Sequence, residues 1–96
     1  MEQPTNTAYS TTISSLNELP NYVGKELGLT EWMPIEQDRI NKFADVTEDR
    51  QWIHIDQEKS ATFSPYKKTV AHGFLVLSMA SKIAYDAFSV ENIAMG

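Results

Sequence analysis

The sequence holds two histidines, His54 and His72, and each lies where an imidazole could do chemistry. Asp49 lies five residues before His54, in a polar segment that follows a stretch with an apolar stripe. A carboxylate beside an imidazole can pass protons near neutral pH. An isolated pair at this spacing is more often structural, with Asp49 capping a turn and His54 partly buried in a loop. The pair by itself therefore leaves both interpretations open.

His72 and Gly73 come directly before a long apolar segment. A glycine at the start of a helix leaves backbone N–H groups unshielded, and such donors can bind an anion or a developing oxyanion. Alternatively, Gly73 only permits close packing and His72 is a surface cap. Lys67 and Lys68 could meet a phosphate, but a basic pair is more typical of a solvated loop. The sequence shows no phosphate-binding glycine-rich loop, no G-x-S-x-G nucleophile elbow and no cluster of metal ligands.

Hydrophobic periodicity and capping signals predict the elements that must position these residues. We expect a short helix over residues 15–23 capped by Ser15, a helix from Pro34 to about Val46, a turn capped by Asp56, and a long helix over residues 70–88. Between them, we expect an extended segment or strand over residues 29–33 and loops over residues 47–56 and 62–69.

The segment 70–88 is apolar around most of its circumference, so other elements must cover it on several sides. Two modest helices and one possible strand cannot hide all of its large side chains. We therefore expect a partner chain or a segment outside these 96 residues to cover the rest, several of the side chains to be exposed, and the 96-residue chain alone not to be the active unit. The side chains concerned are Phe74, Leu75, Leu77, Met79, Ile83 and Phe88.

Composition restricts the class of protein further. A chain of 96 residues fits one domain, which we place at residues 16–96 after a Ser-, Thr- and Asn-rich flexible tail over residues 1–15. The absence of cysteine excludes disulfides, thiolate zinc sites and a cysteine nucleophile. A net charge of −5 argues against a nucleic-acid partner. The chain shows no membrane span and no signal peptide, so we expect a cytoplasmic protein.

Two separated motifs give the sequence a specific resemblance. FADVTEDRQWIHID at residues 43–56 is followed by VAHGFLVLSMASKI at residues 70–83. Together they resemble the MaoC-like dehydratases, the (R)-specific enoyl-CoA hydratases, whose pattern is F-A-x-x-T-x-D-x-N-P-x-H-x-D and then a small residue, His-Gly and an apolar helix. The resemblance covers about residues 16–90, and Gln51-Trp52 in place of Asn-Pro is similar to a branch named after nodulation protein N. The matching residues are Phe43, Ala44, Thr47, Asp49, His54, Asp56, Ala71, His72 and Gly73.

The resemblance implies an α+β hotdog fold, in which a strongly curved antiparallel sheet wraps one central helix. Residues 70–88 would be that helix, which would explain why it is apolar nearly all round. In the family the domain continues beyond this helix with strands that supply most of the sheet. The resemblance therefore implies that the C-terminal strands are missing from this chain.

The resemblance also implies roles for individual residues. Asp49 and His54 would activate a water for addition to C3 of a trans-2-enoyl thioester and carry the proton that C2 receives. Gly73 and His72 would contact the substrate, with the Gly73 N–H polarising the thioester carbonyl. Ser81 would orient the catalytic carboxylate.

The resulting hypothesis is a hydratase or dehydratase that acts on acyl thioesters of CoA or a carrier protein, as a homodimer, without metal, cofactor, nucleic-acid or membrane partner. One alternative is a non-catalytic hotdog protein that serves dimerisation or acyl-thioester binding. Another is a thioesterase, although thioesterases of this fold usually place a carboxylate on the central helix and Asp86 lies near its end. The presence of both Asp49 and His54 favours the hydratase.

Overall fold

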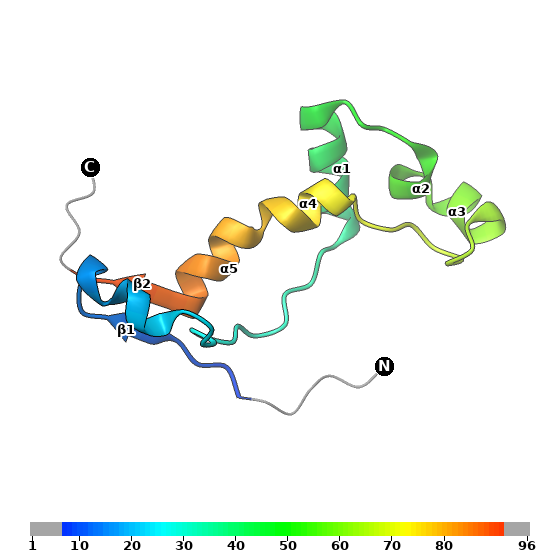
Figure 1. The fold of residues 1–96 in the computed structure, drawn as a ribbon. Coiled ribbons are helices and arrows are strands. Elements are labelled where there is room, and N and C mark those ends of the chain that lie inside the picture. The colour runs from blue at the N-terminus through cyan, green and yellow to red at the C-terminus, as the bar shows by residue number, and fades with distance from the viewer. Residues whose placement is uncertain (1–6, 92–96) are drawn as a thin grey trace. The chain divides into compact units, whose positions relative to one another are not determined.

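The computed structural model describes residues 7–91, which form an α+β arrangement of short helices and one two-stranded sheet (Figure 1). The chain divides into two compact units. Among the described residues, unit 1 combines residues 7–32 with residues 80–91, and unit 2 is Met33–Met79. Within residues 7–91, no helix is both long enough and apolar enough to cross a membrane.

Unit 1 is built on a pair of parallel strands. Strand β1 (Thr11–Ile13) pairs with β2 (Phe88–Val90), and Ile13 lies opposite Val90. Parallel strands need a long crossover connection, and here the whole intervening chain supplies it. The connection ends in helix α5 (Ala80–Ala87), which leads directly into β2. The described sheet is therefore parallel, whereas the resemblance implied antiparallel strands.

Strand β1 lies inside the segment 1–15 that composition predicts to be a flexible tail. Thr and Ile are β-branched residues that favour strands, and Ile13 is fully buried. Just before β1, Tyr9 and Leu29 exchange two backbone hydrogen bonds of 2.9 Å. The structure thus corrects the tail prediction for residues 11–13, because pairing with a distant segment orders them, while residues 1–6 lie outside the described residues.

The first predicted helix is present as a 3₁₀ helix, η1 (Leu16–Tyr22). Ser15 occupies the N-cap position as predicted, but its side chain makes no capping hydrogen bond. The apolar residues of this segment, Leu16, Leu19 and Val23, are all exposed. A 3₁₀ helix has three residues per turn, which places residues 16 and 19 on one edge, and this edge faces solvent.

Helix α1 (Gln37–Thr47) of unit 2 ends where the sequence predicts but begins three residues after Pro34. Glu36 still has an extended backbone and occupies the N-cap position, so Pro34 lies before the helix and not in its first turn. Ile40 and Ala44, four residues apart, are the buried residues of α1. This spacing places both on one helical face, as an amphipathic helix requires.

Two short helices follow α1. Helix α2 (Trp52–Ile55) is a single turn in the segment predicted to be a loop. Helix α3 (Gln57–Phe63) begins at the predicted cap, because the Asp56 carboxylate accepts a 2.9 Å hydrogen bond from the Lys59 N–H. The cap prediction is confirmed, and the loop prediction for residues 47–56 is wrong at α2.

The long apolar segment forms two helices where one was predicted. Helix α4 (Gly73–Ser78) belongs to unit 2 and α5 to unit 1, with a turn at Met79 between them. The Met79 N–H lies within hydrogen-bond distance of two carbonyls, and the Ser78 hydroxyl donates to the Leu75 carbonyl at 2.7 Å. Such side-chain bonds to the preceding turn compete with regular helical hydrogen bonds, which accounts for the interruption.

Three of the six large side chains named for this segment are exposed, as the sequence predicts. Phe74 is 75% exposed, Leu77 is 65% exposed and Ile83 is 41% exposed, whereas Leu75 is buried. Exposed apolar side chains of this size indicate a surface that another structure covers.

Candidate active site

Asp49 lies where the chain leaves α1. Glu48 ends the helix with a left-handed φ of 65°, which turns the backbone out of its helical path. The Thr47 hydroxyl donates to the Phe43 carbonyl at 2.7 Å and accepts a 3.3 Å hydrogen bond from the Asp49 N–H. The Thr47 side chain thus bonds back to the preceding turn of the helix and at the same time holds the backbone of Asp49.

His54 projects from α2 and is anchored through one ring nitrogen. Its Nδ1 lies 2.8 Å from the Val70 carbonyl oxygen, which can only accept, so Nδ1 carries a hydrogen. In the neutral ring Nε2 then has the lone pair and can take up a proton. The Val70 N–H in turn donates to the Ile53 carbonyl at 3.0 Å, so this contact runs in both directions.

Gln37, in the first turn of α1, anchors the same region. Its side-chain nitrogen donates to the His54 carbonyl at 2.8 Å and to Asn41 Oδ1 at 2.9 Å. Its side-chain oxygen accepts a 2.6 Å hydrogen bond from the Thr69 hydroxyl. Gln37 thus joins α1 to α2 and to the segment before α4. Nothing in the sequence indicates a role for Gln37, since a polar side chain at a helix start carries no local sign of so distant a contact.

His72 is buried, with 2% of its surface exposed. Its Nε2 lies 2.9 Å from the Asp49 carbonyl oxygen. Its ring stacks on that of His54, with centroids 3.8 Å apart and planes 23° apart, and it lies 4.9 Å from the Phe43 ring. The alternative that His72 is a surface cap is therefore wrong, because His72 occupies the N-cap position of α4 but its side chain is buried and makes no capping hydrogen bond.

The structure brings three of the candidate residues together. One carboxylate oxygen of Asp49 and one nitrogen each of His54 and His72 lie within 4.8 Å of one another. Neither Asp49 nor His54 is buried. Each hydrogen bond to a water spans roughly 2.7–3 Å, so a carboxylate oxygen and an imidazole nitrogen within 4.8 Å of each other are within reach of a single bridging water. Their catalytic roles stay predictions.

The same three side chains are potential metal ligands, a cluster that the sequence analysis did not find. A zinc ion lies along a nitrogen lone pair, in the plane of the imidazole, at roughly 2.0–2.1 Å. The stacked rings of His54 and His72 are close to parallel, so their lone pairs do not converge on one point. A backbone carbonyl also occupies one nitrogen of each ring. This geometry suits proton transfer better than metal binding.

Gly73 is the first residue of α4 and is exposed. Its N–H belongs to the first helical turn and has no acceptor within the helix. A methyl group in place of its hydrogen would meet no atom within 4 Å, so space for a ligand lies beside it. Ser81 lies on α5 in unit 1 and is exposed, and its role toward Asp49 stays a prediction.

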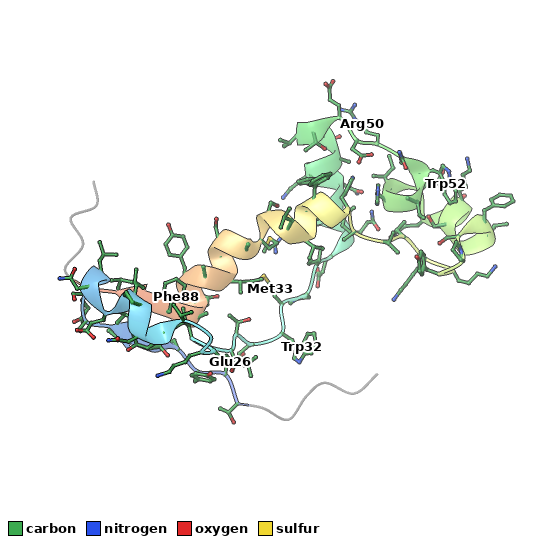
Figure 2. The ribbon with its side chains drawn as sticks, viewed as in Figure 1. Glu26, Trp32, Met33, Arg50, Trp52 and Phe88 are labelled. Carbon is green, nitrogen blue, oxygen red and sulfur yellow. The ribbon has the colours of Figure 1, made fainter. Side chains whose placement is uncertain are left out.

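The departure from the family motif lies at the start of α2. Figure 2 shows Trp52 on this helix and Arg50 in the segment before it. The Lys59 ammonium lies 5.0 Å from the centre of the Trp52 ring, within reach of a cation–π interaction. Gln51 is the exposed N-cap residue of α2. The substitution therefore changes the surface next to His54 while the anchor of its ring is retained.

Comparison with known proteins places the chain in a family. Residues 18–95 match the MaoC like domain. The chain belongs to the MaoC-like family. This MaoC-like chain is 45% identical over 72 residues to nodulation protein N of Rhizobium leguminosarum bv. viciae. The aligned residues make up 75% of the chain and 45% of that protein.

A second relative has a name that describes an activity. The chain is 34% identical over 84 residues to 3-hydroxyacyl-thioester dehydratase Z of Mycobacterium tuberculosis (strain ATCC 25618 / H37Rv). The aligned residues make up 88% of the chain and 55% of that protein. The MaoC-like chain thus spans about half the length of the curated relatives it matches. Membership confirms the resemblance drawn from the two motifs, implies the hotdog fold and supports, at family level, an enzyme of the dehydratase or hydratase kind.

Proposed function

We propose that the protein adds water reversibly to trans-2-enoyl thioesters, giving (R)-3-hydroxyacyl thioesters. The observation that carries this proposal is the arrangement of Asp49 and His54. A carboxylate lies within 4.8 Å of an imidazole whose Nδ1 is anchored on a backbone carbonyl, leaving Nε2 as a base. The name of the mycobacterial relative supports an acyl-thioester substrate.

The reaction needs a base, a proton donor and a site for developing negative charge. A water held by the Asp49 carboxylate loses a proton to His54 Nε2 while its oxygen bonds to C3. The electron pair of the C2–C3 double bond moves toward the thioester oxygen, which accepts a hydrogen bond from the Gly73 N–H. The proton then returns from the pair to C2, so that the product is the neutral hydroxyacyl thioester. Acid–base groups contribute about 10²–10⁴-fold and an oxyanion donor on the order of 10²–10³-fold.

Two matched variants, Asp49→Asn and His54→Asn, test the proposal in the protein as its natural gene encodes it. Asp49→Asn removes the charge that holds water. His54→Asn retains a side-chain N–H at the position of Nδ1, and with it the bond to the Val70 carbonyl, but has no basic nitrogen. We expect each variant to reduce crotonyl-CoA hydration by about 10²–10⁴-fold, followed through the ultraviolet absorbance of the enoyl thioester. Thermal melting should be close to wild type, because neither side chain is buried.

The wild-type assay separates this proposal from a binding role. A wild-type protein that binds the acyl thioester without turnover would contradict hydration and favour the non-catalytic alternative. The thioesterase alternative has little support from α5, where the Asp86 carboxylate is paired at 2.8 Å with Lys82 of the same helix. Release of free CoA without hydration would establish hydrolysis.

A further inference from the structure

We propose that His72 is a positioning residue that sets the spacing between Asp49 and His54 and never contacts the substrate. This inference rests on the proposed hydratase function and deepens it. It replaces the expectation that the His72 side chain binds substrate, because that side chain is 2% exposed. The next residue, Gly73, is exposed.

The hydrogen bond of His72 fixes which ring nitrogen carries the hydrogen. Nε2 lies 2.9 Å from the carbonyl oxygen of Asp49, so Nε2 is the donor. In the part of the chain that the structure describes, Nδ1 is buried and has no hydrogen-bond partner. A hydrogen on Nδ1 would be a buried donor without an acceptor, which is costly. The tautomer with hydrogen on Nε2 alone therefore fits the site, and it keeps the Asp49 backbone tied to the ring.

The faces of the His72 ring explain how it acts on His54. The His54 imidazole stacks on His72 at 3.8 Å, and the ring of Phe43, on α1, is 4.9 Å away. His72 thus lies as a flat spacer in contact with side chains of both α1 and α2. The backbone of Val70, two residues earlier, holds His54 Nδ1. The segment from Val70 to His72 therefore holds both the backbone of Asp49 and the imidazole of His54. The His72 side chain itself stays buried.

Two amide substitutions at His72 distinguish the effect of its hydrogen bond to the Asp49 carbonyl from the effect of the space that its side chain fills. In His72→Gln the side-chain nitrogen can reach the position of Nε2 and still donate to the Asp49 carbonyl. In His72→Asn the nitrogen corresponds to Nδ1 and cannot reach that carbonyl. We expect His72→Asn to lower kcat for crotonyl-CoA hydration by about 10²-fold, because misplacement by about 1 Å has that effect, with KM little changed. His72→Gln should recover most of this loss.

Hydrogen–deuterium exchange gives a second readout that needs no activity. The backbone of residues 48–51 should exchange faster in His72→Asn than in wild type and at close to the wild-type rate in His72→Gln. Phe43→Leu keeps the hydrogen bond and loosens only the ring contact, so it should lower kcat less than His72→Asn, again with KM unchanged. This third variant decides the matter if both amide variants fail to fold.

The outcomes are distinguishable. Equal kcat for the Gln and Asn variants, or unchanged exchange at residues 48–51, would overturn the positioning role. So would a Phe43→Leu variant with wild-type kcat where the amide variants do not fold. A raised KM with unchanged kcat would instead show that His72 binds substrate. An inactive wild type would overturn the proposed function, and faster exchange in His72→Asn alone would still support the structural link between His72 and Asp49.

Discussion

At the scale of single residues, the backbone turn that leads into Asp49 is shaped by the immediate neighbours of Asp49. Glu48 adopts a left-handed conformation that costs a non-glycine residue about 1–2 kcal/mol, and Thr47 binds the backbone on both sides of it. The turn is therefore specified by short-range hydrogen bonds. The imidazole of His54 differs, because its anchor, the Val70 carbonyl, is 16 residues away.

Gly73 allows a residue-scale prediction about substrate approach. A methyl group at this position meets no protein atom within 4 Å, so Gly73→Ala should melt at close to the wild-type temperature. If a thioester carbonyl lies against the Gly73 N–H, the same methyl group should obstruct the carbonyl and lower kcat/KM by about 10-fold or more. Complete loss of an oxyanion donor costs about 10²–10³-fold, so we expect a smaller effect from partial obstruction. Steady-state hydration kinetics and thermal melting check both parts. Wild-type kinetics would show that the substrate does not approach Gly73.

At the scale of elements, close approach of backbone segments holds unit 1 together. Gly28 lies against the end of α5 and against the backbone of Tyr9, which pairs with Leu29, in a place where a side chain does not fit. A methyl group there would lie 2.2 Å from the Ala87 carbonyl oxygen and 2.8 Å from that of Tyr9. Since both contacts are with backbone, relief requires the segments themselves to move apart.

We expect Gly28→Ala to lower the free energy of unfolding by about 1–3 kcal/mol, the usual cost of overpacking. The loss should appear as a lower midpoint in urea denaturation. Gly24→Asn is the matched control in the same unit, because Gly24 has a φ of 78° that Asn tolerates and a Cβ there meets nothing within 4 Å. Identical midpoints for the two variants would contradict the close approach at Gly28.

At the scale of the whole molecule, the described residues leave apolar surface that a stable protein does not keep in water. The match to the MaoC like domain over residues 18–95 extends across both units, which supports our proposal that they belong to one hotdog domain. On α4, the exposed Phe74 and Leu77 lie three residues apart and so share a face. We propose that a second copy of the protein covers this face.

Sedimentation tests the homodimer. At micromolar concentration the wild-type protein should sediment at twice its protomer mass, because burial of apolar surface stabilises the pair by roughly 25 cal/mol per Å². Leu77→Glu should shift the protein to the monomer, whereas Val46→Glu, at an 83% exposed site on α1, should not. A wild-type protein found only as a monomer would contradict the proposal.

The sequence alone determined what depends on neighbours a few positions apart. The end of α1 near Val46 follows from its apolar stripe, and the start of α3 follows from the Asp56 cap. The two motifs also determined the family and indicated Asp49 and His54 as the candidate pair. Capping, helical periodicity and motif spacing are local properties, so they can be read without knowing the path of the chain.

Tertiary structure alone decided the contacts between distant residues. These include the pairing of β1 with β2, the bond from Thr69 to Gln37 across 32 positions and the bond from His72 to Asp49 across 23. With the same local sequence around it, a polar residue can either form such a distant contact or stay in solvent. Which of the two occurs depends on where the folded backbone brings the partner. For that reason His72 could be read from the sequence as a surface cap, while the fold buries it between Phe43 and His54.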